Sequence, residues 1–334
     1  MLATLLVSSL LTLVSQSVAP PQQSSPDKVA AASPGERGEI PVGKCECSVS
    51  VGAYGIPVFF YRPERWVGER MILVMHGVMR NADEYRDHSV AMGDRLNALI
   101  VAPLFDSERF PSRAYQRGGI LREDGSAAPK HEWTYALIPS IAAAVRSMVG
   151  VEGMPFSILG HSAGGQFVMR MSAFQDTGAE RLVAANPGTD LFPTRGMQFG
   201  YGFGGLPDAM SNDEHIRRYL AAPLTIYLGT ADDQPDENFE TSEPAMAQGS
   251  GRHQRGLACF WSAKTLADAR GWAFGWRLVE AHGVGHDHER MFDHPNCELA
   301  LYGKGGVPPP EAKSGLPADQ QKAEQGKDAR HNVK

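Results

Sequence analysis

The chain has 334 residues, of which 42% are hydrophobic and 21% are charged. This composition is ordinary for a globular protein with a substantial core, and the length would allow one large domain or two small ones. The formal net charge of −6 shows no excess of basic residues, which argues against a nucleic-acid partner.

The first 19 residues form an apolar run that ends in a short polar stretch. The run is too short to span a bilayer comfortably, and Ser17 and Ala19 supply the small residues that signal peptidase requires. No Lys or Arg precedes the run and Pro20 follows it, so an uncleaved anchor or a misplaced start codon is the alternative. The sequence predicts a signal peptide over 1–19 and a secreted or periplasmic protein, with no stable membrane insertion after processing.

Residues 20–44 and 303–334 are rich in Pro and in small or polar residues. Such segments bury too little apolar surface to order themselves, so we expect a flexible linker and a disordered tail. Residues 45–302 are expected to form one folded domain between them.

This central region alternates strand and helix patterns. A hairpin is expected over 47–61, and buried strands follow at 70–75 (RMILVM) and 99–102 (LIVA), separated by a helix over 83–98. Further strands are predicted at 156–159, 181–185, 223–228 and 275–279, and further helices at 134–149 and 163–174. The alternation implies an α/β fold with a mainly parallel central sheet, helices on both faces and an N-terminal antiparallel hairpin.

Residues 160–164 (GHSAG) match the pattern G-x-S-x-G. A strand pattern runs directly into this segment and a helix pattern runs directly out of it. So sharp a turn strains the backbone of Ser162, requires glycine at the two flanking positions, and raises the Ser162 hydroxyl above the carboxyl edge of the sheet. The pattern favours Ser162 as a nucleophile over the alternative, a glycine-rich turn with a capping serine.

A serine hydroxyl needs a base at neutral pH, and with this turn the acid and then the histidine follow the serine along the chain. The loop after the last predicted strand reads EAHGVGHDHER and contains His282 and His286. We prefer His286 as the base because it follows Gly285 and precedes an apparent helix, whereas His282 lies almost at the strand end.

The acid is expected just after the preceding strand, where Asp232 and Asp233 are adjacent. Asp232 is preferred because it lies nearer the strand end. Two backbone N–H groups should stabilise an oxyanion: that of Ala163, after the nucleophile, and that of Val78, in the loop after the strand at 70–75. Met79 is a near alternative to Val78.

Imidazoles in the same loop also raise the question of a zinc site. His282 and His286 form H-x-x-x-H, but two glycines lie between them, so no helix would align the pair. Further possible ligands nearby are Asp287, His288, Asp293 and His294. Because a metal would leave the G-x-S-x-G segment unexplained, the sequence predicts no metal and no cofactor.

Four cysteines fit an oxidising compartment without proving it. Cys45 and Cys47 are too close for an unstrained bridge to each other. Cys259 and Cys297 flank the last predicted strand and could be joined by a disulfide, although four cysteines allow three full pairings.

Several motifs occur in the order and rough spacing seen in bacterial α/β-hydrolases: HGVMRNADEYRD, PLFD, EWTY, GHSAGG, AANPG, YLGTADD and HGVGHDHE. Over residues 71–297 the chain resembles the serine esterases related to poly(3-hydroxybutyrate) depolymerases and to feruloyl or acetylxylan esterases. The resemblance implies that residues 45–302 form an α/β-hydrolase catalytic domain.

The same resemblance implies site residues. It assigns Ser162, Asp232 and His286 to a catalytic triad, and Val78 and Ala163 to the oxyanion hole. Val78 stands where a Cys often follows His-Gly in the depolymerases, and the chain has no appended substrate-binding domain. Both departures put attack on an insoluble polymer in doubt.

Loop residues at the carboxyl edge are candidates for substrate contact, namely Tyr115, Trp133 and Asn186, with a core position for Trp133 as an equal alternative. Residues 199–206 (FGYGFGGL) are interpreted as a mobile lid. These features predict a secreted serine hydrolase that cleaves small or polymeric carboxylic esters through an acyl-enzyme. A peptidase or thioesterase of the same fold, or a non-catalytic binding protein that retains it, are the alternatives.

Overall fold

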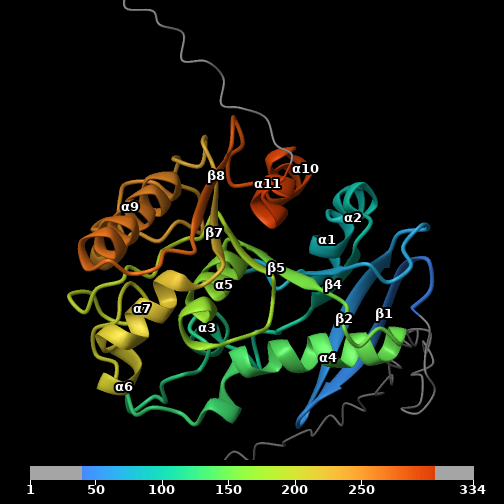
Figure 1. The fold of residues 1–334 in the computed structure, drawn as a ribbon, viewed down its shortest axis with the longest axis horizontal. Coiled ribbons are helices and arrows are strands. Elements are labelled where there is room, and N and C mark those ends of the chain that lie inside the picture. Colours follow the sequence, from blue (N-terminus) through green and yellow to red (C-terminus); the bar gives the residue numbers. More distant parts are fainter. Residues whose placement is uncertain (1–39, 305–334) are drawn as a thin grey trace, which may run out of the picture. The chain divides into compact units, whose positions relative to one another are not determined.

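A computed structural model describes residues 40–304, which contain one eight-stranded sheet (Figure 1). The strands are β1 (Gly43–Val51), β2 (Tyr54–Arg62), β3 (Met71–Met75), β4 (Leu99–Pro103), β5 (Phe156–His161), β6 (Arg181–Ala185), β7 (Leu224–Gly229) and β8 (Arg277–Ala281). Their order in the sheet is β1-β2-β4-β3-β5-β6-β7-β8. Strands β3 to β8 pair in parallel, while β2 is antiparallel to both β1 and β4. The predicted mainly parallel sheet with an antiparallel hairpin at one edge is confirmed.

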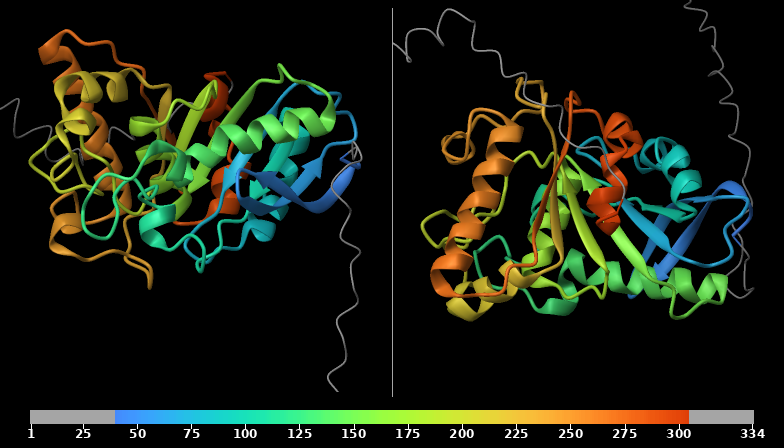
Figure 2. Two further views of the ribbon diagram at one scale, coloured as in Figure 1. Left: turned by 90° about the horizontal axis from the view of Figure 1, so that it is seen from below. Right: turned by 45° about the horizontal axis from the view of Figure 1, so that its top comes forward.

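Helices cover both faces of this sheet, as Figure 1 and the two views of Figure 2 show. One face carries α4 (Leu137–Val149), α5 (Ala163–Phe174), α7 (Asp213–Ala221) and α9 (Arg252–Arg270). The other carries α1 (Ala82–Asp87), α2 (Val90–Leu96), α10 (His288–Asp293) and α11 (Asn296–Tyr302). Shorter turns complete the chain: α3 (Ser112–Tyr115), η1 (Lys130–Glu132), η2 (Thr134–Ala136), α6 (Asp208–Ser211) and α8 (Glu243–Met246).

The two layers of helices explain why the central strands read as continuous apolar runs. Side chains alternate across a strand, so Met71 and Leu73 of β3 enter the core under α4 and α5, while Ile72 and Val74 enter the opposite core. Every residue of β3 is fully buried. A strand covered on one face only would instead alternate with polar residues.

Two predicted boundaries differ from the structure. The helix expected over 83–98 is two helices, because the chain turns at His88 and Ser89, where the Ser89 hydroxyl donates a 2.7 Å hydrogen bond to the carbonyl of Tyr85. The linker expected to continue to residue 44 gives way earlier: Ile40 is buried in the core and β1 begins at Gly43. The signal-peptide prediction, the rest of the linker and nearly all of the predicted tail fall outside the described residues.

The expected Cys259–Cys297 disulfide is absent, and all four thiols are free. Cys259 lies on α9 in one core, 3.5 Å from the carbonyl oxygen of Leu191. Cys297 lies on α11 in the other core, 3.6 Å from the Met92 sulfur. Because the sheet separates these cores, flanking the same strand in sequence does not bring the two thiols together. Within residues 40–304, no helix is long and apolar enough to cross a membrane.

Candidate active site

Ser162 lies at the turn between β5 and α5, with a backbone conformation of φ 57° and ψ −118°. A positive φ at a non-glycine residue costs about 1–3 kcal/mol and persists only where the surroundings hold it. Here the Ser162 amide donates to the carbonyl of Ala185 at 3.0 Å, and the Ser162 carbonyl accepts from the amide of Gln166 at 2.9 Å. The strained backbone leaves the half-buried Ser162 side chain at the carboxyl edge of the sheet.

The glycines beside Ser162 are required by close backbone approach. A Cβ placed on Gly160 would lie 2.2 Å from the carbonyl oxygen of Gly164, and one on Gly164 would lie 2.1 Å from that of Met75. Real side chains do not tolerate such distances from backbone atoms, so α5 can start this close to β5 and to the end of the neighbouring β3 only with glycine at both positions.

His286 and Asp232 form a close pair at the same edge of the sheet. Nδ1 of His286 lies 2.7 Å from Oδ2 of Asp232, whose side chain is almost completely buried just beyond β7. Asp233, the sequence alternative, is exposed, and its carboxylate accepts a 3.2 Å hydrogen bond from Gln234 instead. The described contacts therefore join His286 to Asp232 and leave Asp233 in solvent.

His161 and Asn186 connect this pair to Ser162. The ring of His161, which precedes Ser162, lies 4.6 Å from the ring of His286, centroid to centroid. Asn186 follows the strand beside Ser162; its side chain accepts from the amide of Gly229 at 2.7 Å and donates to the carbonyl of Gly285 at 3.0 Å. The ends of β6 and β7 and the loop before His286 are thus held to one another next to Ser162.

Arg252, at the start of α9, is a contributor that sequence reasoning missed. Its buried guanidinium donates to Oδ1 of Asp232 at 3.3 Å and makes two shorter bonds to Asp236, at 2.7 and 2.8 Å. The Asp232 carboxylate therefore has one oxygen on His286 and the other on a cation. Nothing in the local sequence around Arg252 signals this role, because the contact depends on how α9 returns to the end of β7.

The loop after β3 brings backbone close to Ser162. A Cβ on Gly77 would lie 3.9 Å from Cβ of Ser162 and 2.7 Å from the Tyr85 hydroxyl. Val78, the next residue, is 41% exposed. Among residues 40–304, the amides of Val78 and Ala163 donate no hydrogen bond to the backbone. Neither amide is therefore taken by a hydrogen bond among the described residues, and their role as oxyanion donors stays a prediction.

Tyr115, a predicted substrate contact, supports this loop from behind. It is fully buried, donates to the carbonyl of His76 at 2.8 Å, and stacks on the His76 ring. Burial lowers the pKa of His76 to about 4, so the imidazole is neutral and its Nε2 accepts from the amide of Phe105 at 3.0 Å. On the other side, Arg80 donates to the carbonyls of Phe105 and Phe110. These contacts fix the loop, and a contact of Tyr115 or Asn186 with substrate stays a prediction.

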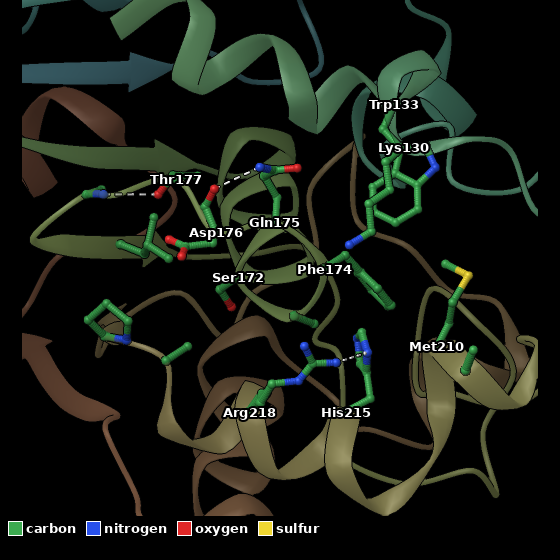
Figure 3. Close-up of a pocket in the computed structure, with 16 residues that line it drawn as sticks. Lys130, Trp133, Ser172, Phe174, Gln175, Asp176, Thr177, Met210, His215 and Arg218 are labelled. Carbon is green, nitrogen blue, oxygen red and sulfur yellow. Dashed lines mark hydrogen bonds between the residues drawn. The ribbon is translucent and has the colours of Figure 1, made fainter. Parts of the chain in front are cut away.

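Trp133, the third predicted substrate contact, lies at the other end of α5 from Ser162. It is buried, donates to the carbonyl of Ala128 at 2.8 Å, and lies 6.5 Å from the ring of Phe174, the last residue of α5. Figure 3 shows it beside a cavity of about 370 Å³ that Lys130 and Phe174 also line. The 12 residues of α5 separate this cavity from Ser162, and at about 1.5 Å per residue the helix places the two at its opposite ends.

A second cavity, of about 470 Å³, is lined in part by Gln166, which lies one helical turn after Ser162 on α5. Eight residues line it, three of them arginines: Ser112, Arg113, Gln116, Arg117, Gln166, Arg170, Thr189 and Glu240. Arg170 is buried, and its guanidinium donates hydrogen bonds to the carbonyl of Gly200 and to the Thr189 hydroxyl. Arg117 is exposed; its guanidinium lies 6.0 Å from the Tyr201 ring centroid and, within the described part of the chain, makes no hydrogen bond or ion pair. We call this cavity the arginine pocket.

Residues 199–206, interpreted from sequence as a lid, are packed into the protein beside this pocket. Phe203 and Tyr201 are buried, and the amide of Phe203 donates to the carbonyl of Thr194 at 2.7 Å. A Cβ on Gly202 or Gly204 would meet backbone of residues 194–197 within 2.8 Å. The glycines therefore serve tight packing of this segment, and the lid interpretation does not agree with the structure.

A buried carboxyl, that of Asp190, lies close to Arg170 and Arg255. It is fully buried, and among the described residues neither of its side-chain oxygens has a hydrogen-bond partner. Burial outweighs the attraction of the two guanidinium groups and raises the pKa of Asp190 to about 7. The native state therefore keeps a proton that the unfolded chain releases near pH 4.

Asp190→Asn should remove this proton linkage. A raised native pKa means that stability falls as pH rises from about 4 to 7, whereas the amide does not titrate. We expect the variant and the parent to have similar free energies of unfolding near pH 4, and the variant to be more stable by about 2–4 kcal/mol at pH 8. Urea denaturation at both pH values measures this; a stability difference independent of pH would contradict it.

The imidazoles suggested by sequence as zinc ligands do not gather around His286. Among the described residues, the one group with metal-like spacing joins His288 to Glu84 and His88, and it contains neither His282 nor His286. Burial and the neighbouring His88 lower the pKa of His288 to about 4, so its ring is neutral at physiological pH. His294 lies apart, with Nδ1 accepting from the amide of Asn296.

Two solved structures are similar to this chain over most of their own length. Poly(aspartic acid) hydrolase-1 from Sphingomonas sp. KT-1 is 31% identical, with a TM-score of 0.70, over 75% of this chain and 96% of that one. The LpqC poly(3-hydroxybutyrate) depolymerase from Bordetella parapertussis is 32% identical, with a TM-score of 0.69, over 75% and 85% of the two chains. No family model and no curated protein matches the sequence.

Proposed function

Because this chain belongs to the α/β-hydrolase serine esterases related to poly(3-hydroxybutyrate) depolymerases, we propose that it cleaves carboxylic esters at Ser162 through an acyl-enzyme. The observation that carries the proposal is the strained Ser162 turn beside the 2.7 Å pair of His286 and Asp232. A non-catalytic binding protein would have no need of a strained serine together with a buried acid–histidine pair.

The proposed reaction begins with proton transfer from the Ser162 hydroxyl to Nε2 of His286 as the oxygen attacks the ester carbonyl. Nδ1–H of His286 donates to Asp232, which fixes the tautomer and stabilises the imidazolium that forms. The amides of Val78 and Ala163 donate to the developing oxyanion. His286 then gives the proton to the leaving alcohol. In the second half, His286 takes a proton from water as the water attacks the acyl carbon, and returns it to Ser162 as the acid leaves.

The arginine pocket supports a preference for esters that carry an anionic group. Its lining includes Gln166, one turn of α5 after Ser162, and Arg117, whose exposed guanidinium lies 6.0 Å from the Tyr201 ring centroid and has no hydrogen bond among the described residues. A relative named poly(aspartic acid) hydrolase-1 makes an amide in an acidic polymer a second candidate substrate. The same serine mechanism would serve both esters and amides. We favour esters because an alcohol is a better leaving group than an amine.

Arg117→Gln tests the preference. We expect kcat/KM for an ester with a carboxylate in its acyl part to fall about 10-fold, while kcat/KM for the matching neutral ester is unchanged, because a charge-assisted hydrogen bond contributes about 1.5–3 kcal/mol before solvent screening. Arg217→Gln on α7, which removes an exposed arginine paired with Glu214, is the matched control. Equal losses for both esters would refute the preference.

Export remains part of the proposal and rests on residues 1–19. Expression of the full chain in a bacterial host, followed by intact-mass measurement of the periplasmic and extracellular fractions, tests it. A product shortened to begin near residue 20 in those fractions is expected. Retention of the intact chain with the cell membranes would favour the uncleaved anchor instead.

A fluorophosphonate probe tests the proposed nucleophile. We expect one label per chain, on the peptide that contains Ser162, and no label on Ser162→Ala. Failure of the parent to react, or labelling that persists in Ser162→Ala, would refute the enzyme proposal. Turnover of p-nitrophenyl esters, thioesters and peptide amides by the same preparation then separates an esterase from a thioesterase or a peptidase.

A further inference from the structure

Three side chains from two segments far apart in sequence meet beside the candidate active site. Glu84 and His88 lie one turn apart on α1, since His88 continues the helix with φ −74° and ψ −4°. His288 is the first residue of α10. Nδ1 of His88 lies 2.8 Å from Nε2 of His288, and Oε1 of Glu84 lies 4.0 Å and 3.9 Å from these two nitrogens. We call this group the His88 cluster.

We propose that the His88 cluster binds one Zn²⁺ ion through Nδ1 of His88, Nε2 of His288 and a carboxylate oxygen of Glu84. Two imidazoles and one carboxylate form a ligand set that zinc accepts, with water in the fourth position. Tetrahedral zinc with bonds of about 2.0–2.2 Å holds its ligand atoms about 3.3–3.5 Å apart. The observed separations lie on either side of that value, so small side-chain rotations produce the site.

Neighbouring groups orient all three ligands. Oε2 of Glu84 accepts a 2.6 Å hydrogen bond from the Asn81 side chain, which turns Oε1 toward the imidazoles. Nε2 of His88, the nitrogen that does not face His288, lies 3.8 Å from the carboxylate of Glu289. A carboxylate on the outer nitrogen of a histidine is the arrangement that fixes its tautomer and strengthens it as a zinc ligand. The His288 ring stacks on Tyr85 with centroids 4.0 Å apart and planes at 4°.

Charge and access also suit a divalent cation. Glu84 and Glu289 are about half exposed, and His88 is 29% exposed, so an ion can reach the cluster from solvent. The two carboxylates offset the charge of the ion. Without a metal, one of the two rings donates the 2.8 Å hydrogen bond to the other, and zinc binding moves that proton to the other nitrogen of the donor ring.

The His88 cluster is distinct from the proposed catalytic pair. His286 uses Nδ1 for Asp232, and its side chain is not a member of the cluster. Two contacts link them: Tyr85 stacks on His288 and has its hydroxyl 3.3 Å from Nδ1 of His161, and the His288 ring lies 5.8 Å from the His161 ring, centroid to centroid. Zinc at the cluster would join α1 to α10, so the effect we expect is on the stability of the fold. Binding to the native state alone raises the unfolding temperature.

Competition with a chromophoric zinc chelator at pH 7.5 tests the proposal on the untagged full chain, with Zn²⁺ as the only added ligand. We expect one ion per chain, an affinity at least 10-fold weaker in Glu84→Gln, and loss of 100-fold or more in His88→Ala. His131→Ala, which removes a largely exposed imidazole, is the matched control and should bind as the parent does. Zinc should raise the unfolding temperature of the parent and of His131→Ala, and not that of His88→Ala.

Three results would overturn the proposal. The first is a parent protein that binds no zinc in competition with the chelator. The second is binding that survives in both His88→Ala and Glu84→Gln. The third is binding lost in His286→Ala but kept in His88→Ala, which would place the ion at the catalytic pair. Because Glu84 is a surface side chain, Glu84→Gln keeps the test valid should His88→Ala fold poorly.

Discussion

Asp232→Asn is expected to lower kcat about 10⁴-fold for any ester that the protein cleaves, with little change in KM. Asparagine has the same shape but can present an N–H to His286, which then holds the imidazole in the tautomer whose Nε2 cannot accept the Ser162 proton. The fold should persist, because Arg252 keeps its two shorter bonds to Asp236 when the Asp232 charge is removed. Single-turnover kinetics with an activated ester measure the loss.

Asp233→Asn is the matched control, because it makes the same chemical change one residue along. Asp233 is exposed and its carboxylate bonds only to Gln234, so we expect kcat within about twofold of the parent. Similar losses in the two variants would mean that the pair of His286 and Asp232 does not orient the base. A loss confined to Asp233→Asn would assign the role to the other carboxylate.

The sequence predicted the arrangement around Ser162 because the information there is local. A buried strand, a glycine-flanked serine and a helix occupy consecutive residues, and the helix over 163–174 was predicted with its observed bounds. Parallel strands end at a common edge, so residues that follow β7 and β8 had to lie near Ser162. Strand order and chain order together bring Asp232 and His286 to that edge.

The remaining features depend on tertiary contacts that no local pattern records. Arg252 reaches Asp232 from a helix 20 positions downstream, and His88 meets His288 across 200 positions. Asn186, a candidate for substrate contact, also makes hydrogen bonds with Gly229 and Gly285 that its position after a strand does not predict. A polar residue that the sequence places in a loop can be buried in the fold, because its burial depends on hydrogen-bond partners from distant segments. Trp133 is a second example. It lies near Phe174, at the end of α5 away from Ser162, and no local pattern shows which end of that helix Trp133 approaches.

Gly164→Ala is expected to cost several kcal/mol of stability, and it tests the closeness of strand and helix at Ser162 without altering any proposed catalytic group. The added Cβ would lie 2.1 Å from the carbonyl oxygen of Met75 and 2.7 Å from that of His76. Both atoms are backbone, so relief requires moving the end of β3 or the start of α5. A destabilisation of about 4 kcal/mol corresponds to a fall of about 10 °C in the unfolding temperature of a domain this size.

Gly153→Ala is the control that isolates this effect from the general consequence of replacing glycine. A Cβ there has no heavy atom within 4 Å, and its backbone does not require a positive φ. We expect its unfolding temperature to match that of the parent or to exceed it slightly, because alanine reduces the entropy of the unfolded chain. If Gly164→Ala unfolds at the same temperature as Gly153→Ala, the strand and helix do not approach as closely as the Ser162 turn requires. If Gly164→Ala unfolds earlier and is also inactive below its unfolding temperature, the angle at this turn sets both stability and the position of the Ser162 hydroxyl.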